Sequence, residues 1–497
     1  MKKLSTSKIK RQGQVFTPHY LVSNMLDYCN YFGSNIIGKH IIDNSCGDGA
    51  FLCEVVKRYC NVCVSSGIDK NQIKSDLQNY IHGIELDIMA YEKCIENLNR
   101  IANDFNLTDI VWDVHNEDTL NVDRYNSKMD FVVGNPPYVR VHNLHNNYDN
   151  VKKFSFANGG MTDLYLVFFE IGFKMLNKSG KLCYITPSSW LGSKAAYNMR
   201  KYIVSNKNMV SLIDLGHYQA FDSISYSLIS IFENNLCSNS FEYYVYDSNL
   251  KNRIFVDNLT YKDIYINSNF YLSSKEKLVE LHKIKCSLCS SYVKVKNGFA
   301  TLADKVFIGE KIPDSPYTIE VLKASTGKWY KCFFPYDKTG KPLPQETILS
   351  HSKIADYLIS HKETLIKSDK RKKDWYLFGR TQAIRDVYID KIAVNTIIKD
   401  KNSVKINFVP AGKGVYSGLY IVSNVEFSII EKIIKSEEFI DYLQVLKNYK
   451  SGGYYTFNSK DLEQYINYKL KLYYNGKARN SISTDKCRVF EGDFKLF

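Results

Sequence analysis

The four residues Asn135-Pro136-Pro137-Tyr138 have the composition of a site for a planar group that carries an amine. Two consecutive prolines fix the backbone and remove two N–H donors, so the carbonyl groups of this turn remain acceptors. We expect the Asn135 side-chain oxygen and a proline carbonyl to accept both hydrogens of one exocyclic NH2 group. This polarisation restores the nitrogen lone pair as a nucleophile, while Tyr138 stacks on the ring. The alternative interpretation is a tight turn without chemistry.

A second candidate site is the segment from Asp43 to Leu52, which contains Gly47 and Gly49. In a turn between a strand and a helix, glycines let the backbone approach a ligand closely. The spacing is not G-x-G-x-x-G, and no Gly-Lys-Ser/Thr follows. The segment therefore does not predict a dinucleotide site or a nucleoside-triphosphate site.

Acidic residues at the ends of the next strands complete this candidate site. Glu85 ends the second predicted strand, where a carboxylate can hold ribose hydroxyls. Asp69 lies closer to the glycines and is the alternative. Glu85 is preferred because residues 65–80 show no apolar periodicity and are predicted to be a polar insertion. Asp118 ends the third strand, where its carboxylate could accept a hydrogen bond from an adenine amine.

The elements that must position these residues alternate between strands and helices. Short apolar runs predict strands at 40–43, 81–85, 109–114, 129–133, 181–186, 210–215 and 227–232. Amphipathic stretches predict helices at about 18–30, 50–60, 88–103, 163–176 and 194–206. This alternation is typical of a doubly wound, Rossmann-like α/β domain, in which ligands bind at the carboxyl ends of the strands. The last two strands are predicted to form a hairpin around 216–225, which makes the sheet mixed.

The net charge of +14 lies entirely in the second half of the 497-residue chain. Residues 1–245 contain 24 Lys and Arg and 24 Asp and Glu, whereas residues 246–497 contain 42 and 28. We expect a catalytic domain at 1–245, a transition region at 246–290 and a polyanion-binding α+β domain at 291–497. A lysine-rich solvated surface is the alternative explanation of the charge.

Several classes of protein are excluded or disfavoured by composition. No run of 18 apolar residues predicts a membrane span, and no apolar stretch follows the N-terminal MKKLSTSKIKRQ. Twelve cysteines do not make a disulfide scaffold, so reduced thiols in a cytoplasmic protein are expected. Cys60-x-x-Cys63 and Cys286-x-x-Cys289 have zinc-like spacing, but no Cys/His pair completes either, and no metal is expected. The segment 313–323 lacks the acid-x-Lys spacing of a nuclease.

Taken together, the motifs resemble those of the gamma-class N6-adenine DNA methyltransferases, with TaqI-like enzymes as the nearest architecture. Gln14 to Pro18 is similar to the family's N-terminal motif, Asp43 to Leu52 to its glycine motif, and Asn135 to Tyr138 to its catalytic motif. The family often has Pro where Asn44 stands. The resemblance implies methyl transfer from S-adenosylmethionine to adenine N6 in a specific duplex sequence, with the target base flipped out of the helix.

The resemblance also implies roles for individual residues. The catalytic set is Asn135, Pro136, Pro137 and Tyr138, and Phe221 is the second aromatic residue that holds the flipped base. Within the cofactor set, Leu86 and Phe168 would sandwich the cofactor adenine. The whole cofactor set is Phe16, Thr17, Pro18, Asp43, Cys46, Gly47, Gly49, Glu85, Leu86, Asp118 and Phe168.

The second half is similar, more loosely, to the same family's target-recognition domain. The similar pieces are Lys296 to Thr301, Gly379 to Gln382 and Ser451 to Tyr455. Arg380 and Gln382 are predicted to bind DNA. The basic run is predicted to contact phosphates, with a solvated loop as the alternative, and consists of Lys370, Arg371, Lys372 and Lys373.

The expected partner is double-stranded DNA, together with a cognate restriction endonuclease if the protein belongs to a restriction-modification system. The protein is expected to be a monomer. Two alternatives stay open: a methyltransferase that acts on an RNA base or a protein glutamine amide, and an inactive DNA-binding module. The basic second half favours DNA, and the complete set of acidic residues with Asn135 favours an active enzyme.

Overall fold

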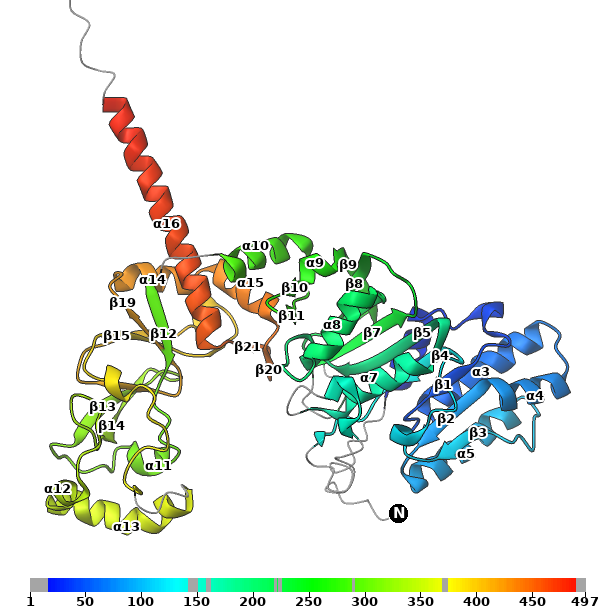
Figure 1. Ribbon diagram of the computed structural model, residues 1–497, viewed down its shortest axis with the longest axis horizontal. Helices are drawn as coiled ribbons and strands as arrows, with labels where there is room; N and C mark the ends of the chain where they lie inside the picture. The colour runs from blue at the N-terminus through cyan, green and yellow to red at the C-terminus, as the bar shows by residue number, and fades with distance from the viewer. Residues whose placement is uncertain are drawn as a thin grey trace, which may run out of the picture. The chain divides into compact units, whose positions relative to one another are not determined.

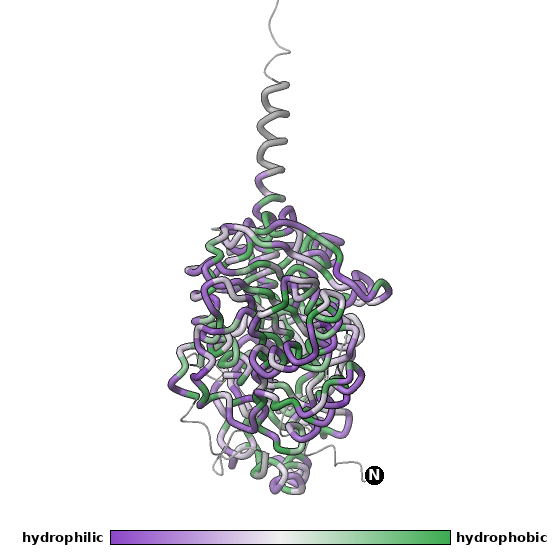
Figure 2. Tube along the Cα trace, turned by 90° about the vertical axis from the view of Figure 1, so that its right-hand side faces the viewer, coloured by the Kyte–Doolittle hydropathy of each residue, from purple (hydrophilic) through white to green (hydrophobic). Residues whose placement is uncertain are grey.

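The computed structural model of the protein describes residues 17–141, 151–157, 162–218, 221, 226–287, 291–368 and 374–488. The chain divides into two compact units, Met1–Val279 and Glu280–Phe497. Hydrophobic and hydrophilic residues alternate over short distances along the trace (Figure 2). Among the described residues, no helix combines the length and the apolar character needed to cross a membrane.

The first unit is built on a nine-stranded sheet with the order β3-β2-β1-β4-β5-β7-β6-β8-β9 (Figure 1). Strands β3, β2, β1, β4 and β5 run parallel, whereas β7 is antiparallel to both β5 and β6. The predicted doubly wound α/β fold with a mixed sheet edge is therefore confirmed. The strands are β1 (Ile41–Asp43), β2 (Ile81–Glu85), β3 (Asp113–Asn116), β4 (Met129–Gly134), β5 (Leu176–Pro187), β6 (Met209–Asp214), β7 (Ser227–Glu233), β8 (Ser240–Asp247) and β9 (Asn252–Thr260).

Helices lie along this sheet, with α3, α4 and α5 against β2 and α7 against β4 and β5 (Figure 1). Their positions agree with the predicted helices except for α4, which falls in the supposed polar insertion. That helix buries only two apolar side chains, Ile73 and Leu77, too few to produce a periodic pattern. The described elements are α2 (His19–Tyr28), α3 (Ala50–Ser65), α4 (Lys70–Tyr80), α5 (Ile88–Asn103), α7 (Leu164–Met175), α8 (Tyr197–Asn206), α9 (Tyr261–Ile264) and the short strands β10 (Tyr265–Ile266) and β11 (Asn269–Phe270).

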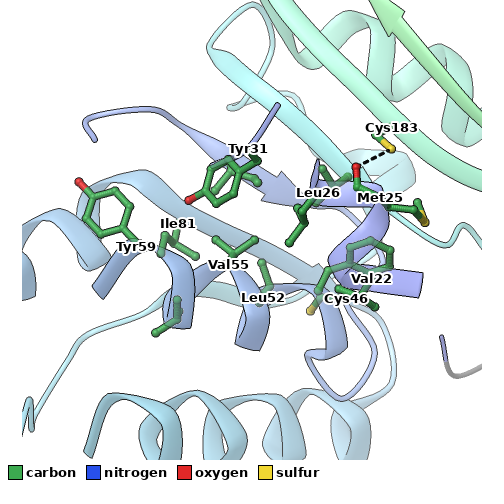
Figure 3. Packing of buried hydrophobic residues seen from close by; sticks show 14 of the residues in the cluster. Val22, Met25, Leu26, Tyr31, Cys46, Leu52, Val55, Tyr59, Ile81 and Cys183 are labelled. Atoms are coloured by element: carbon green, nitrogen blue, oxygen red, sulfur yellow. Dashed lines mark hydrogen bonds between the residues drawn. The ribbon is translucent and has the colours of Figure 1, made fainter. Parts of the chain in front are cut away.

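The two faces of the sheet are covered by different helices, as alternation along β5 shows. Cys183 and Ile185 pack into a core formed with α2, α3 and α5. Tyr184, between them, faces α7, where a Cβ placed on Gly172 would lie 2.8 Å from its hydroxyl oxygen. The absence of a side chain at Gly172 thus lets α7 approach the sheet closely. Figure 3 shows the core that contains Cys183, in which the Cys183 thiol donates to the Met25 carbonyl at 3.5 Å.

The division between the units differs from the expected boundary at 245. Strand β9 pairs with β8 along its length, and both strands extend the nine-stranded sheet. Helix α9 follows directly, and the backbone N–H of Met209 donates to the Tyr261 hydroxyl at 2.9 Å. Residues 246–279 are therefore part of the first unit and not a transition region. Strands β8 and β9 are half exposed, so their polar residues hide the strand pattern.

The second unit is α+β, with a four-stranded sheet (β12-β19-β15-β17) and two three-stranded sheets (β14-β13-β18 and β16-β21-β20). Its strands are β12 (Val293–Asn297), β13 (Thr318–Lys323), β14 (Lys328–Phe333), β15 (Lys391–Val394), β16 (Ile397–Ile398), β17 (Ile406–Val409), β18 (Gly414–Tyr416), β19 (Leu419–Ser423), β20 (Tyr449–Lys450) and β21 (Tyr454–Thr456). Its helices are α11 (Asp304–Phe307), α12 (Gln345–Leu349), α13 (Ser352–Ser368), α14 (Phe427–Ile434), α15 (Glu437–Leu446) and α16 (Ser459–Arg488), and α10 (Lys275–Cys286) crosses the division.

Candidate active site

The candidate residues gather at the carboxyl ends of the adjacent parallel strands β1, β2 and β4. Asp43 ends β1 and is the register partner of Gly83 in β2 and Val133 in β4. Gly134 has φ +147°, and a Cβ at this position would lie 2.6 Å from Asp43 Oδ1. A side chain at position 134 would therefore displace the carboxyl group. Because Gly134 has no side chain, Asp43 can lie directly beside the start of the Asn135 motif.

Asp43 is 2% exposed, and its Oδ1 accepts a hydrogen bond from the Ser45 backbone N–H at 3.0 Å. Burial raises the pKa of its carboxyl to about 8, and the nearby Glu85 carboxylate acts in the same direction. A cationic ligand beside this carboxyl would favour its ionised form. The position is thus suited to a ligand that carries positive charge.

Glu85 holds the glycine turn in place. Its Oε2 accepts from the Gly47 backbone N–H and its Oε1 from the Asp87 backbone N–H, each at 2.8 Å. Burial raises the pKa of the Glu85 carboxyl. Asp69, the alternative ribose ligand, instead caps α4 by accepting from the backbone N–H groups of residues 71 and 72. The structure therefore places Glu85, and not Asp69, at the end of the strand beside the turn.

The glycine turn is backed by α5. Gly47 and Gly49 have φ +55° and +89°, a region that side chains disfavour, and a Cβ on Gly49 would lie 2.8 Å from Cys94 Sγ. The Cys46 side chain is 4% exposed and points into the hydrophobic core (Figure 3). Only its backbone therefore faces the turn, where its N–H donates to the Ile84 carbonyl at 3.0 Å.

Asp118 follows β3 and caps a short 3-10 helix by accepting from the Leu120 backbone N–H at 3.0 Å. The next residue, Thr119, donates from Oγ1 to the backbone carbonyl of Asn44 at 2.6 Å. The Asn44 side-chain oxygen in turn accepts from the Tyr184 hydroxyl at 2.9 Å. We call Asn44, Thr119 and Tyr184 the Asn44 junction; it ties the loops of Asp43 and Asp118 to β5.

The Asn44 junction was not predicted from the sequence. Asn44 and Tyr184 are both fully buried, so the hydrogen bond between them has no competition from solvent. One feature of the sequence could have indicated the junction: Asn44 stands where the family often has Pro. A proline side chain at this position could not accept a hydrogen bond from the Tyr184 hydroxyl, whereas the Asn44 side-chain oxygen does.

The amine-binding motif is oriented by the segment before α2. Asn135 Nδ2 donates to Thr17 Oγ1 at 3.2 Å, which fixes the NH2 end of the amide and turns Oδ1 to the opposite side. Thr17 is buried and Pro18 is the cap residue of α2. Phe16, the third residue predicted from this segment, lies outside the described residues.

Aromatic rings converge beside Asn135. The Tyr138 ring lies edge-on to Phe221, with 6.3 Å between centroids and 78° between planes, and edge-on to Tyr165 at 6.4 Å. The Tyr138 hydroxyl donates to the Ile185 carbonyl at 3.1 Å, and burial raises its pKa well above the usual value. The structure thus brings Tyr138 and Phe221 together, and it adds Tyr165, to which no site role was assigned from the sequence.

The remaining predicted cofactor residues occupy different environments. Leu86 is 65% exposed directly after β2, where a planar ligand could cover it. Phe168 is 6% exposed and lies within α7. Within the described ranges, no three His, Cys, Asp or Glu side chains come together as metal ligands.

In the second unit, two of the three predicted recognition segments are in contact. The backbone N–H groups of Gly379 and Arg380 donate to the carbonyls of Thr301 and Ala300, at 2.8 and 3.2 Å. Gln382 uses its side-chain N–H to bind the carbonyl of residue 298 at 2.6 Å, so this side chain is held by the fold. Arg380 is exposed. Residues 451–455 lie instead in the turn between β20 and β21 and at the start of β21. Lys370, Arg371, Lys372 and Lys373 lie outside the described residues.

Comparison with known proteins agrees with this geometry. Residues 51–221 match the model of the Eco57I restriction-modification methylase family. The type II restriction enzyme and methyltransferase RM.Eco57I of Escherichia coli is 23% identical over 542 residues, covering 85% of this chain and 53% of its own length. The type II methyltransferase M.BstVI of Geobacillus stearothermophilus is 27% identical, covering 43% of this chain and 40% of its own length.

A similar fold is seen in the type IIL restriction-modification enzyme MmeI, solved in complex with DNA. The TM-score is 0.62 at 12% identity, covering 88% of this chain and 63% of that one. The present chain spans about half the length of the curated relatives that it matches. The expected relationship to restriction-modification methylases is therefore confirmed.

Proposed function

Residues 51–221 place this chain in the Eco57I restriction-modification methylase family, and from that premise we propose that it is a DNA methyltransferase. The proposed reaction moves a methyl group from S-adenosylmethionine to the N6 atom of adenine within a specific duplex sequence. The observation that carries the proposal is the oriented amide of Asn135, next to the edge-on ring pair of Tyr138 and Phe221.

The residues present fit S-adenosylmethionine. Two buried carboxyl groups, Asp43 and Glu85, end adjacent strands beside a glycine turn, and Asp43 has room only because position 134 has no Cβ. Asp43 is suited to the cationic part of this ligand and Glu85 to ribose hydroxyls, while Asp118 and the exposed Leu86 border the same strand ends. When bound, the cofactor supplies a methyl group made electrophilic by its sulfonium sulfur.

Catalysis then depends on positioning and hydrogen-bond polarisation. Asn135 Oδ1 and the Pro136 carbonyl accept the two hydrogens of the target amine, which directs the nitrogen lone pair toward the methyl group. The amine attacks first and its proton leaves afterwards, so no strong base is needed. Because the adenine amine is out of reach inside a duplex, the base must flip out and be held by Tyr138 and Phe221.

DNA is the proposed substrate for two reasons. The type IIL restriction-modification enzyme MmeI, which has a similar fold, was solved in complex with DNA, and the whole excess of positive charge lies in residues 246–497. A methyltransferase that acts on a protein glutamine amide would not need a basic second unit of this size.

Kinetic long-read sequencing of plasmid DNA from a host that expresses the protein tests this proposal. Wild-type protein should leave a modified adenine within one sequence motif, and Asn135→Ala should leave none while it still binds S-adenosylmethionine. Unmodified plasmid from cells that contain folded wild-type protein would contradict the proposal.

A further inference from the structure

The two recognition segments that touch each other form one surface, which we call the paired loops (residues 298–304 and 379–386). They are joined by the backbone hydrogen bonds described above and rest on a rigid aromatic core. Phe299 lies within the first loop and Phe378 directly precedes the second, and their ring centroids are 5.3 Å apart. Both rings also contact Phe334, and all three are buried. The packing of these three rings thus holds the paired loops in position.

The backbone of the paired loops is strained at two residues that are not glycine. Leu302 has φ +61° and Ala383 has φ +66°, in the left-handed region that side chains with a Cβ disfavour. Non-glycine residues in this region are uncommon, and such strain tends to cluster at functional sites. Ala383 lies three residues after Arg380, and Leu302 lies two residues after Ala300, whose carbonyl accepts from the Arg380 backbone N–H.

The strain presents an apolar side chain to solvent. Leu302 is 54% exposed, yet it lies directly on Gly379, where an added Cβ would meet Leu302 Cγ at 2.4 Å. A residue with a side chain at 379 could not coexist with this placement of Leu302. The exposed position of the Leu302 side chain therefore requires both a strained backbone at Leu302 and a glycine at position 379.

The charges around Leu302 match a polyanion. The two acidic residues of the paired loops are occupied within the unit: Asp386 by Lys296 at 2.6 Å and by the Tyr420 hydroxyl, and Asp304 by Thr301. Arg380 and Arg385 are exposed, and neither has an ion pair with another described residue. Next to Arg385, the turn at 337–341 adds exposed Lys338 and Lys341.

From this surface we propose that the paired loops enter a groove of the target duplex, where Leu302 packs against the base pairs and Arg380 and Arg385 bind beside it. An apolar side chain between cations fits DNA because phosphates surround base edges that carry apolar groups, such as the thymine methyl. A leucine can also insert between base steps. This inference rests on the proposed function and adds the residue that reads the bases.

The test measures binding of fluorescent duplexes that contain either the methylated motif or a scrambled version of it. Leu302→Ala and Leu302→Gly should each weaken binding to the motif by about 5- to 150-fold, and binding to the scrambled duplex much less. Leu302→Gly should also raise the melting temperature, because glycine relieves the left-handed strain. The matched control is Leu472→Ala, which removes a leucine that is 49% exposed on α16 in the same unit and should change neither quantity.

Two results would overturn the inference alone. In the first, the Leu302 variants bind the motif as tightly as Leu472→Ala does. In the second, Leu302→Gly lowers the melting temperature and weakens binding to both duplexes equally, as a purely structural residue would. If the wild-type protein bound no duplex at all, the proposed function would fall together with the inference.

Discussion

The protonation state of the Asp43 carboxyl group offers a direct test of the proposed cofactor site. Its pKa is raised to about 8 because the group is buried beside Glu85. In the absence of ligand it is therefore mostly protonated at neutral pH. A cationic ligand binds the ionised form better, so binding at neutral pH must release a proton.

We predict that the affinity for S-adenosylmethionine increases with pH between about 6 and 8 and then levels off. The increase cannot exceed tenfold per pH unit for one released proton. Calorimetry in buffers of different ionisation enthalpy measures both the affinity and the proton release. The control is Asp43→Asn, for which the pH dependence of the affinity should come only from the ionisable groups of the ligand. Equal pH dependence in both proteins would show that Asp43 does not face the cationic part of the ligand.

The same shift has a consequence for stability without ligand. Because the folded-state pKa lies above the unfolded value, the folded protein binds the extra proton and loses stability as pH rises from about 4 to 8. The loss is at most about 1.4 kcal/mol per pH unit. Asp43→Asn should therefore melt at a higher temperature than the wild type at pH 8 and show a smaller difference at pH 5.

At the scale of elements, the Asn44 junction joins the loops of Asp43 and Asp118 to β5. We predict that Tyr184→Phe destabilises the protein by about 1–3 kcal/mol, because it leaves the buried Asn44 oxygen without its donor. It should also weaken S-adenosylmethionine binding, since the two acidic loops are no longer held together. Chemical denaturation and calorimetry measure the two effects.

A matched control exists in the second unit. The Tyr376 hydroxyl donates to the backbone carbonyl of Leu343 at 3.0 Å, and Tyr376 is buried, as Tyr184 is. Tyr376→Phe should therefore cost comparable stability but leave the affinity for S-adenosylmethionine unchanged. If Tyr184→Phe behaved in the same way, the Asn44 junction would be a stabilising contact with no role in positioning the site.

The elements also show what the sequence could predict and what it could not. Strands β2 and β4 begin where the sequence pattern predicts them, and so the motif at Asn135 could be placed at a strand end. The third strand begins at Asp113 and not at 109, because Asp109 adopts a left-handed backbone. Helix α4 and strand β9 were missed because each buries few apolar side chains, so tertiary packing rather than local pattern decides them.

Contacts between distant residues were the least predictable part of the site. Tyr138 and Phe221 could be paired because both belong to recognised motifs. Tyr165 reaches Tyr138 through a ring contact, and the Asn44 junction is held by hydrogen bonds between separate elements. No local sequence pattern encodes contacts of this kind. Cys46 was expected in the cofactor site, but its side chain points into the core because an alternating pattern cannot show which way a turn residue faces.

At the scale of the whole molecule, the uneven charge predicts that the second half supplies the salt-dependent part of DNA binding. Each lost phosphate contact should reduce the slope of log K against log salt by about one unit. Replacing the run 370–373 by alanine should therefore flatten the slope and weaken binding to motif and scrambled duplexes about equally. The control removes the same charge from the neutral half, at Lys57, Lys70, Lys74 and Lys178. A wild-type slope after the change at 370–373 would identify that run as a solvated surface.

The most direct test of the central claim is to identify the methylated product. Purified protein is incubated with duplex DNA and methyl-labelled S-adenosylmethionine, and the DNA is digested to nucleosides and analysed by mass spectrometry. The account predicts label in N6-methyladenine alone, and none with Asn135→Ala. Label in a methylated cytosine with none in adenine, or no label in the DNA at all, would contradict it.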